Sequence, residues 1–267
     1  APTLVLLHGL EGSSESSHVV GIGYKAFMNG FNVIRLNMRN CGGSMQYART
    51  LYNAGLYQDI LKVMEIVSAE NDDPRFVLSG YSLGGNLLLN AAAVASKNDN
   101  HNLIAVCAVS PSIDLSRSVE ALESPENQVY AKWFLSGMKR KVLAKFKQHP
   151  DMFDVTGLHQ INTIKDFDDR FTAPDGGYGS ADRYYEEASS INKLKDISVP
   201  TLIIASEDDP LVPIGSFHEI ADVTSNKMIE LLITDQGGHC GFLQARQEDE
   251  KFCDHFWAEN RVVAFMK

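Results

Sequence analysis

The chain has 267 residues, of which 44% are hydrophobic and 22% are charged, so it has enough apolar side chains for a sizeable globular core. Its formal net charge of −10 disfavours nucleic acid as a partner and gives no electrostatic attraction to anionic membranes. No stretch approaches the roughly 18 consecutive apolar residues that a membrane-spanning helix needs. We therefore expect one globular domain with a sizeable insertion.

Apolar runs alternate with helical patterns along the first part of the chain. The predicted elements are strand 4–7, helix 19–29, strand 32–36, helix 54–69, strand 75–79, helix 83–95 and strand 104–109. Uninterrupted apolar runs suit strands that are covered on both faces. This alternation predicts a mostly parallel sheet with helices on both faces and a functional site at the carboxyl ends of the strands.

The alternation stops after the fourth predicted strand. Between residues 113 and 198 no buried strand is evident, and helical patterns occur at about 125–147 and 181–194. A plain connection is rarely longer than about 15 residues. We therefore interpret 113–198 as an inserted helical lid.

The sheet pattern returns towards the end of the chain. Strands are predicted at 200–205 and 228–233, followed by a closing helix at 248–265. The predicted core of the domain therefore consists of residues 1–112 and 199–267.

The cysteines and the start of the chain give information about the cellular compartment of the protein. The four cysteines have no paired spacing, and a chain of this size does not need disulfides; they are Cys41, Cys107, Cys240 and Cys253. Free thiols in a reducing cytoplasm are the simplest interpretation, and no signal peptide is visible. Because Ala1-Pro2-Thr3 leads at once into an apolar run without an initiator methionine, we expect that sequence upstream of residue 1 is missing.

The pentapeptide Gly80-Tyr81-Ser82-Leu83-Gly84 lies between a predicted strand and a predicted helix. This is the pattern of a nucleophile elbow, in which a sharp turn exposes a serine hydroxyl and the glycines allow the close approach of the helix. Since the bare pattern arises by chance in about one in ten chains of this length, it needs supporting residues elsewhere. Ser82 is the candidate nucleophile.

A serine hydroxyl needs a base to take its proton and a third group to orient that base. His239 follows the last predicted strand in a glycine-rich loop, where a lone histidine is usually an ordinary surface residue. Glu207, Asp208 and Asp209 follow the preceding strand and compete for the role of the acid. We favour Asp209, because it lies four residues past Ala205 and immediately before Pro210, at the crest of its loop. The order Ser82, Asp, His239 is the one used by α/β-hydrolases.

Two backbone amides are the expected oxyanion hole for this nucleophile. The Leu83 N–H follows the serine at a helix N-terminus, where the helix dipole favours an anion. The Leu10 N–H lies in the loop after the first strand, beside His8, to which we assign a structural role. An ordinary strand-ending turn is the alternative interpretation of that loop.

The sequence indicates neither a metal nor a cofactor. The histidines and cysteines lack the spacing of metal ligands. Gly42-Gly43-Ser44 is not a phosphate-binding loop, since no Gly-Lys-Ser/Thr follows it.

One predicted lid helix mixes apolar and basic side chains. They are Trp133, Phe134, Leu135, Met138, Val142 and Phe146, interleaved with Lys139, Arg140, Lys141, Lys145 and Lys147. Such a helix could meet lipid or gate an apolar pocket. We favour the alternative, in which the apolar stripe packs on the core and the basic side is solvated.

These residues resemble the YheT-like branch of the α/β-hydrolase superfamily over nearly the whole chain. The resemblance is carried by five segments: 8–13, 39–44, 80–86, 208–210 with 237–242, and 167–174 followed by Tyr184-Tyr185. It implies an α/β-hydrolase fold in which Ser82 is the nucleophile, Asp209 the acid and His239 the base. Asn40 departs from the pattern, because relatives usually have glycine there, and family members carry several dozen residues before the first strand seen here.

The combined prediction is a serine carboxylesterase with a helical lid that cleaves carboxylic esters through an acyl-enzyme. Bacterial relatives are described as carboxylesterases, whereas eukaryotic relatives include acylglycerol lipases and phospholipases. The alternatives are therefore a lipid hydrolase acting at an interface and a non-catalytic binding protein on the same scaffold. The expected partner is a small-molecule ester or lipid, and any membrane contact is expected to be transient and made through the lid.

Overall fold

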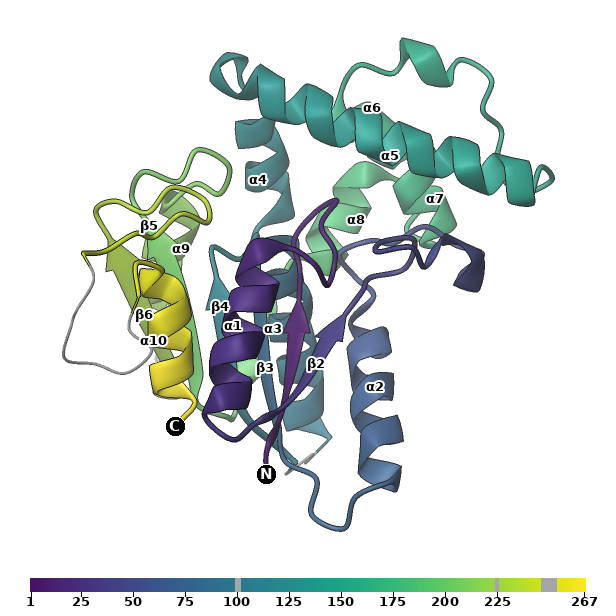
Figure 1. Cartoon of the computed structure of the whole chain (residues 1–267). Coiled ribbons are helices and arrows are strands. Elements are labelled where there is room, and N and C mark those ends of the chain that lie inside the picture. The colour runs from purple at the N-terminus through teal and green to yellow at the C-terminus, as the bar shows by residue number, and fades with distance from the viewer. Residues whose placement is uncertain (99–101, 224–225, 246–253) are drawn as a thin grey trace.

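The computed structural model describes residues 1–98, 102–223, 226–245 and 254–267. Within them, six parallel strands form one sheet in the order β2-β1-β3-β4-β5-β6 (Figure 1). The strands are β1 (Thr3–Leu7), β2 (Asn32–Leu36), β3 (Phe76–Tyr81), β4 (Leu103–Val109), β5 (Thr201–Ser206) and β6 (Ile229–Thr234). The parallel sheet predicted from the sequence is confirmed.

The direction of the strand order reverses between β1 and β3. The chain passes from β1 outward to β2, returns to β3 on the other side of β1, and continues away through β4, β5 and β6. Connections that leave neighbouring strands in opposite directions open a crevice at the strands' carboxyl ends, which is the usual ligand site of such sheets. The loop after β1 begins at His8 and the turn after β3 contains Ser82, so both lie at this crevice.

Helices cover both faces of the sheet, as the sequence predicts. One pair packs together on one face and a second pair on the other; they are α1 (Ser17–Met28) with α10 (Trp257–Phe265), and α2 (Tyr57–Ala69) with α3 (Leu83–Lys97) (Figure 1). Successive side chains of β1 belong alternately to the two cores, as a strand covered on both faces requires. Helix α3 is buried along nearly its whole length, which explains why its sequence is apolar nearly all round.

Between β4 and β5 the chain forms only helices and loops. The helices are α4 (Leu115–Leu122), η2 (Pro125–Asn127), α5 (Gln128–Gln148), η3 (Leu158–Gln160), α6 (Ile164–Phe167), η4 (Asp168–Thr172), α7 (Ala173–Asp175), α8 (Ala181–Ala188) and η5 (Ile191–Asp196). Figure 1 shows α5 lying across the carboxyl end of the sheet, with α4 rising towards it. Part of this helical insertion has a small apolar core of its own around α5 and α6.

The predicted helix 181–194 is interrupted in the structure, because side chains of α3 capture its backbone. The Asn86 side chain accepts a hydrogen bond from the Ser190 N–H at 2.9 Å and donates to the Ala188 carbonyl at 2.9 Å. Asn90 donates to the same carbonyl at 2.8 Å. These bonds replace helical ones, so α8 ends at Ala188 and a short 3₁₀ segment follows.

Two helices of eight or more residues are absent from the prediction, and the closing helix is shorter than predicted. The missed helices are α4 and α9 (Gly215–Val223); α4 has an N-cap signal, since the Asp114 carboxylate accepts from the Arg117 N–H at 3.1 Å. The closing helix begins at Trp257. Residues 254–256 precede it in a non-helical conformation. The first part of the predicted helix, 248–253, lies outside the described residues.

Cysteine pairing and membrane spans can be stated for the described part of the chain. Cys41, Cys107 and Cys240 are free, whereas Cys253 is not among the described residues. No helix in the described ranges combines the length and the hydropathy that crossing a bilayer would require.

Candidate active site

The turn around Ser82 has the geometry of the expected elbow. Strand β3 ends just before Ser82 and α3 begins just after it, and the φ of Ser82 is +53°. A non-glycine residue in this left-handed region costs of order 1–3 kcal/mol. The Ser82 N–H donates to the Val109 carbonyl at 2.9 Å, which fixes the turn to the neighbouring strand. The glycine at position 84 is needed for space, because a Cβ there would collide with the His8 carbonyl oxygen.

His239 and Asp209 form a close pair across two adjacent loops. The His239 Nδ1 lies 2.9 Å from Oδ2 and 3.1 Å from Oδ1 of Asp209. The Asp209 side chain is only 2% exposed, and its Oδ1 accepts from the N–H groups of Leu211 at 2.8 Å and Val212 at 3.0 Å. The carboxylate is therefore fixed, and an Nδ1–H donating to it leaves His239 Nε2 free to accept a proton.

Asp208, the competing acid, has a different role. Its Oδ1 accepts from the Ser206 hydroxyl at 2.5 Å and from the N–H groups of Gly237 at 2.9 Å and Gly238 at 2.7 Å. The hydrogen bond from Ser206, followed by those from the two glycines, lowers the pKa of the Asp208 carboxyl. Asp208 thus shapes the loop that carries His239, and the hydrogen-bonded partner of His239 is Asp209.

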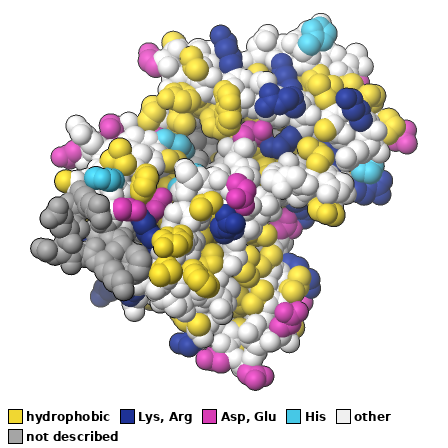
Figure 2. Space-filling model, in the orientation of Figure 1, with side chains coloured by type: hydrophobic (Ala, Val, Ile, Leu, Met, Phe, Trp, Pro, Cys, Tyr) yellow, Lys and Arg dark blue, Asp and Glu magenta, His cyan; other side chains and the backbone are white. Residues whose placement is uncertain are grey.

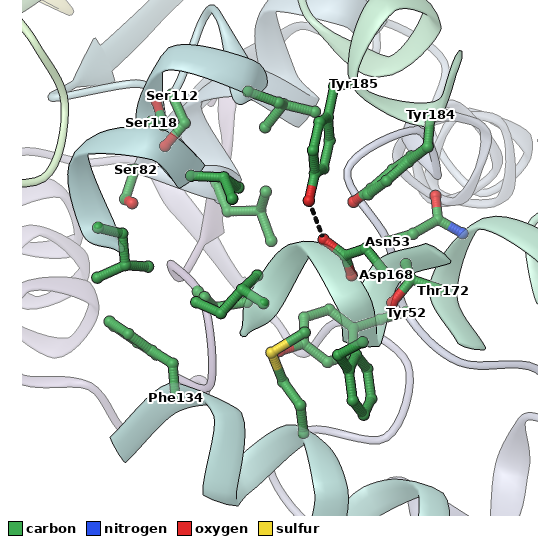
Figure 3. Close-up of a pocket in the computed structure, with 18 of the residues that line it drawn as sticks. Tyr52, Asn53, Ser82, Ser112, Ser118, Phe134, Asp168, Thr172, Tyr184 and Tyr185 are labelled. Carbon is green, nitrogen blue, oxygen red and sulfur yellow. Dashed lines mark hydrogen bonds between the residues drawn. The ribbon is translucent and has the colours of Figure 1, made fainter. Parts of the chain in front are cut away.

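One cavity brings the candidate residues together. Ser82, His239, Leu10 and Leu83 all line it. Most of the remaining wall is apolar and includes Leu115, Val119, Leu122, Phe134, Met138 and Leu211. Figure 3 shows Ser82 on one side of this space and Asp168 on the other, with apolar side chains between them. Asp209 does not line the cavity and instead lies behind His239.

The two candidate oxyanion donors flank the same space. The Leu83 amide is at the N-terminus of α3, and the Leu10 amide is in the loop after β1. Within the described ranges neither N–H donates to a protein acceptor. Neither amide is therefore occupied by a protein acceptor in the described part of the chain.

His8 and Asn40 hold neighbouring loops. The buried His8 ring donates from Nδ1 to the Gly9 carbonyl at 2.7 Å and accepts at Nε2 from the Met38 N–H at 3.1 Å. Burial lowers the pKa of His8, so the ring is neutral and fits the predicted structural role. Asn40 has a φ of +64°, a conformation that asparagine tolerates better than most residues, and its side chain donates to the Thr50 carbonyl at 2.8 Å.

His18 is a third histidine near the site, and the fold keeps it uncharged. Its ring packs on Tyr81 with centroids 4.3 Å apart, and its Nε2 is buried without a hydrogen-bond partner among the described residues. Burial, with smaller contributions from His8 and His239, lowers the pKa of His18 to about 4. His18 therefore binds a proton less readily in the folded state than in the unfolded chain, where its pKa is near 6.5.

This difference predicts a pH dependence of stability. Because the folded pKa of His18 lies below its unfolded value, its contribution is fully present above about pH 6.5 and is lost as the pH falls towards about 4. Between pH 7 and pH 4.5 the wild type should lose about 2 kcal/mol more unfolding free energy than a His18→Phe variant. Urea unfolding at both pH values measures this, and equal losses in the two proteins would contradict it.

Several polar residues of the cavity wall were not singled out from the sequence as site residues. Asp168 is buried, and its Oδ2 accepts from the Tyr185 hydroxyl at 2.8 Å (Figure 3). Burial raises the pKa of Asp168 to about 7, against the opposing effect of hydrogen bonds from Thr172 and Tyr185. In the sequence, Asp168 lies in the segment 167–174, which carries part of the family resemblance. That segment gave no indication of a functional role for Asp168.

The favoured interpretation of the basic lid helix is partly wrong. Leu135, Met138 and Val142 of α5 are buried, as the packed stripe requires. The basic side, however, is not simply solvated. Lys145 is fully buried and donates to the carbonyls of Met45 and Ala48, because the loop after β2 packs against this helix and covers the ammonium.

Comparison with curated proteins identifies similar chains. This chain is 29% identical to "Putative esterase YheT" of Escherichia coli, covering 98% of this chain and 75% of that protein. It is 30% identical to the monoacylglycerol lipase of Saccharomyces cerevisiae, covering 92% and 56%, and 29% identical to phospholipase ABHD3 of Mus musculus, covering 91% and 59%. It therefore spans little more than half the length of the last two proteins.

Solved structures share the fold at low sequence identity. The Pyrococcus furiosus esterase Pf2001 superposes with a TM-score of 0.62 at 18% identity, covering 99% of this chain and 82% of that one. Est1E from Butyrivibrio proteoclasticus, with ferulic acid bound, gives a TM-score of 0.60 at 19% identity, covering 100% and 88%. The family model described as alpha/beta hydrolase fold matches residues 2–245. With the resemblance to YheT thus confirmed, this chain belongs to the α/β-hydrolase family.

Proposed function

We propose that the chain is a serine hydrolase that cleaves carboxylic esters through an acyl-enzyme. The observation that carries this proposal is the His239–Asp209 pair, joined at 2.9 Å, on the same cavity as a serine held at positive φ. Esterases and lipases among the related proteins support the same class of reaction.

The proposed catalytic groups divide the steps of the reaction among them. The Ser82 hydroxyl attacks the ester carbonyl while His239 Nε2 takes its proton, and Asp209 holds the imidazole and stabilises its positive charge. The Leu10 and Leu83 N–H groups hold the oxyanion of the tetrahedral intermediate. His239 then protonates the leaving alcohol, after which it accepts a proton from the water that attacks the acyl-enzyme, and Ser82 recovers its hydroxyl proton.

The helical insertion is proposed as the lid of this site. Residues 113–198 supply Leu115, Phe134, Met138 and Asp168 to the cavity wall, whereas 1–112 and 199–267 supply the candidate catalytic residues. A cover of this kind excludes water and contributes the surface that selects the substrate.

A lipid ester is the second candidate substrate, and two features favour it. The cavity wall is mostly apolar, and the start of α5 exposes Val129 at 78%, Tyr130 at 50% and Trp133 at 59%. Figure 2 shows apolar side chains gathered over this end of α5. An exposed apolar patch next to a pocket suits contact with a lipid surface.

A fluorophosphonate probe tests the proposed nucleophile directly. The probe should add to the protein with a mass shift that peptide mapping places on Ser82, and heat-denatured protein should not react. An adduct on another residue, or none, would refute the serine mechanism. A panel of p-nitrophenyl esters of increasing acyl length then separates the substrates, since a preference for short soluble acyl groups would argue against a lipase.

A further inference from the structure

Glu11 stands next to the candidate oxyanion donor Leu10 and has a strained backbone. Its φ is +57°, in the left-handed region that costs a non-glycine residue of order 1–3 kcal/mol. Such a conformation persists only where surrounding contacts hold it. The contacts of Glu11 therefore restrain the loop segment that carries the neighbouring Leu10 N–H.

The Glu11 carboxylate is held by two side chains. The Tyr52 hydroxyl donates to its Oε1 at 2.6 Å and accepts from the Glu11 N–H at 3.3 Å. The Lys141 ammonium forms an ion pair with the same Oε1 and lies 4.7 Å from the centre of the Tyr52 ring. Burial raises the pKa of Tyr52 well above its usual value, so the hydroxyl keeps the proton that it donates. Both the backbone and the carboxylate of Glu11 are thereby fixed.

The Lys141–Glu11 ion pair is sheltered from water. The side chains of Glu11 and Lys141 are only 9% and 13% exposed. Without its lysine, a largely buried carboxylate would stand one residue from the amide that must hold a developing negative charge. In a sheltered site this repulsion is weakly screened, so the cation also protects the oxyanion electrostatically.

Lys141 belongs to α5 of the insertion, and α5 rests directly on Glu11. A Cβ on Gly137, one turn before Lys141, would collide with Oε2 of the carboxylate. Lys141 and Tyr52 also line the cavity that contains Ser82. The helix that covers the site thus meets the oxyanion loop at the Glu11 carboxylate.

We propose that Lys141 is a positioning residue: through Glu11 and Tyr52 it fixes the Leu10 N–H, so that this oxyanion donor is in place only while α5 is docked on the core. The inference rests on the proposed esterase function. It couples the lid to the catalytic step without requiring Lys141 to touch the substrate.

The central test is the effect of Lys141→Met in two backgrounds. In the wild type it should lower kcat for a p-nitrophenyl ester tenfold or more, with KM changed less than about twofold, because the lost interaction acts on the transition state. Full loss of one oxyanion donor costs about 10²–10³ in kcat, which sets the upper limit. In a Glu11→Gln background the same substitution should change kcat less than about twofold, since the carboxylate on which Lys141 acts is gone.

Two further variants separate positioning from general destabilisation. Lys145→Met removes another buried lysine one turn along α5, whose ammonium bonds the carbonyls of Met45 and Ala48 and not the oxyanion loop. It should lower the unfolding temperature but leave kcat per active site, titrated with the fluorophosphonate, within about twofold. Lys141→Arg keeps the cation and should retain more kcat than Lys141→Met.

The outcomes distinguish the two hypotheses. Suppose that the wild type is labelled on Ser82. The positioning role is then overturned, while the esterase function stands, if Lys141→Met leaves kcat unchanged. The same conclusion follows if Lys141→Met lowers kcat by as large a factor in the Glu11→Gln background as in the wild type. A loss of kcat in Lys145→Met as large as in Lys141→Met overturns the positioning role equally. If the wild type neither reacts with the probe nor cleaves any ester, the proposed function itself fails, and the positioning role with it.

Discussion

Replacement of Ser82 by alanine is expected to lower kcat for ester hydrolysis by about 10⁴-fold or more. The loss should be this large because the nucleophile, base and acid act as a unit, and His239 without the hydroxyl has no proton to take. The substitution removes one atom from a cavity wall, so KM and the unfolding temperature should change little. Steady-state kinetics with a p-nitrophenyl ester, together with thermal unfolding, measure both quantities.

A matched control comes from a second serine of the same cavity. Ser118 of α4 lines the cavity and donates its hydroxyl to the carbonyl of the N-cap residue Asp114 at 2.8 Å. Ser118→Ala removes the same atom type and should keep kcat within about tenfold of the wild type. Retention of most activity by Ser82→Ala would refute the acyl-enzyme mechanism, whatever the control does.

Asp209→Asn is expected to lower kcat by about 10⁴-fold while the protein stays folded. The asparagine carbonyl can still accept from the N–H groups of Leu211 and Val212, so the loop should keep its shape. The amide, however, carries no negative charge, so it cannot stabilise the imidazolium that forms when His239 accepts the serine proton. The kcat at pH 8, with near-ultraviolet circular dichroism as a check on folding, measures the effect.

Asp208→Asn is the control for this assignment, since the two carboxylates are adjacent in sequence. Asp208 accepts from the Gly237 and Gly238 N–H groups, and an asparagine oxygen can accept them too. We expect a reduction of kcat below about tenfold, together with a lower unfolding temperature. If Asp208→Asn lost more activity than Asp209→Asn, the acid would be wrongly assigned.

The elbow and the order of the proposed catalytic groups could be read from the sequence because both depend on local requirements. A serine held at positive φ needs small residues beside it, and Gly84 meets the His8 carbonyl where no Cβ fits. Asp209 and His239 could be predicted to lie close together because each follows an apolar run that forms a strand. Neighbouring parallel strands end at the same edge of the sheet.

The insertion was predictable as helical, but its details were not. The amphipathic pattern of 181–194 continues past the point at which Asn86 and Asn90 of α3 capture the Ala188 carbonyl. Local propensity carries no information about such a distant competitor, so the helix end was missed. The burial of the Lys145 ammonium was missed for the same reason, because the loop that covers it is 97 positions away in the chain.

The sequence by itself determined the parallel sheet and the strand–turn–helix around Ser82, and it gave the order of the proposed nucleophile, acid and base. Periodicity and turn chemistry are local, and the order of residues along the chain is given. Only the tertiary structure decided that Asp168 faces the cavity, that Asp209 and not Asp208 meets His239, and that Lys141 reaches Glu11. That last pair is 130 positions apart, and a contact at such a separation exists only once the helical insertion packs on the core.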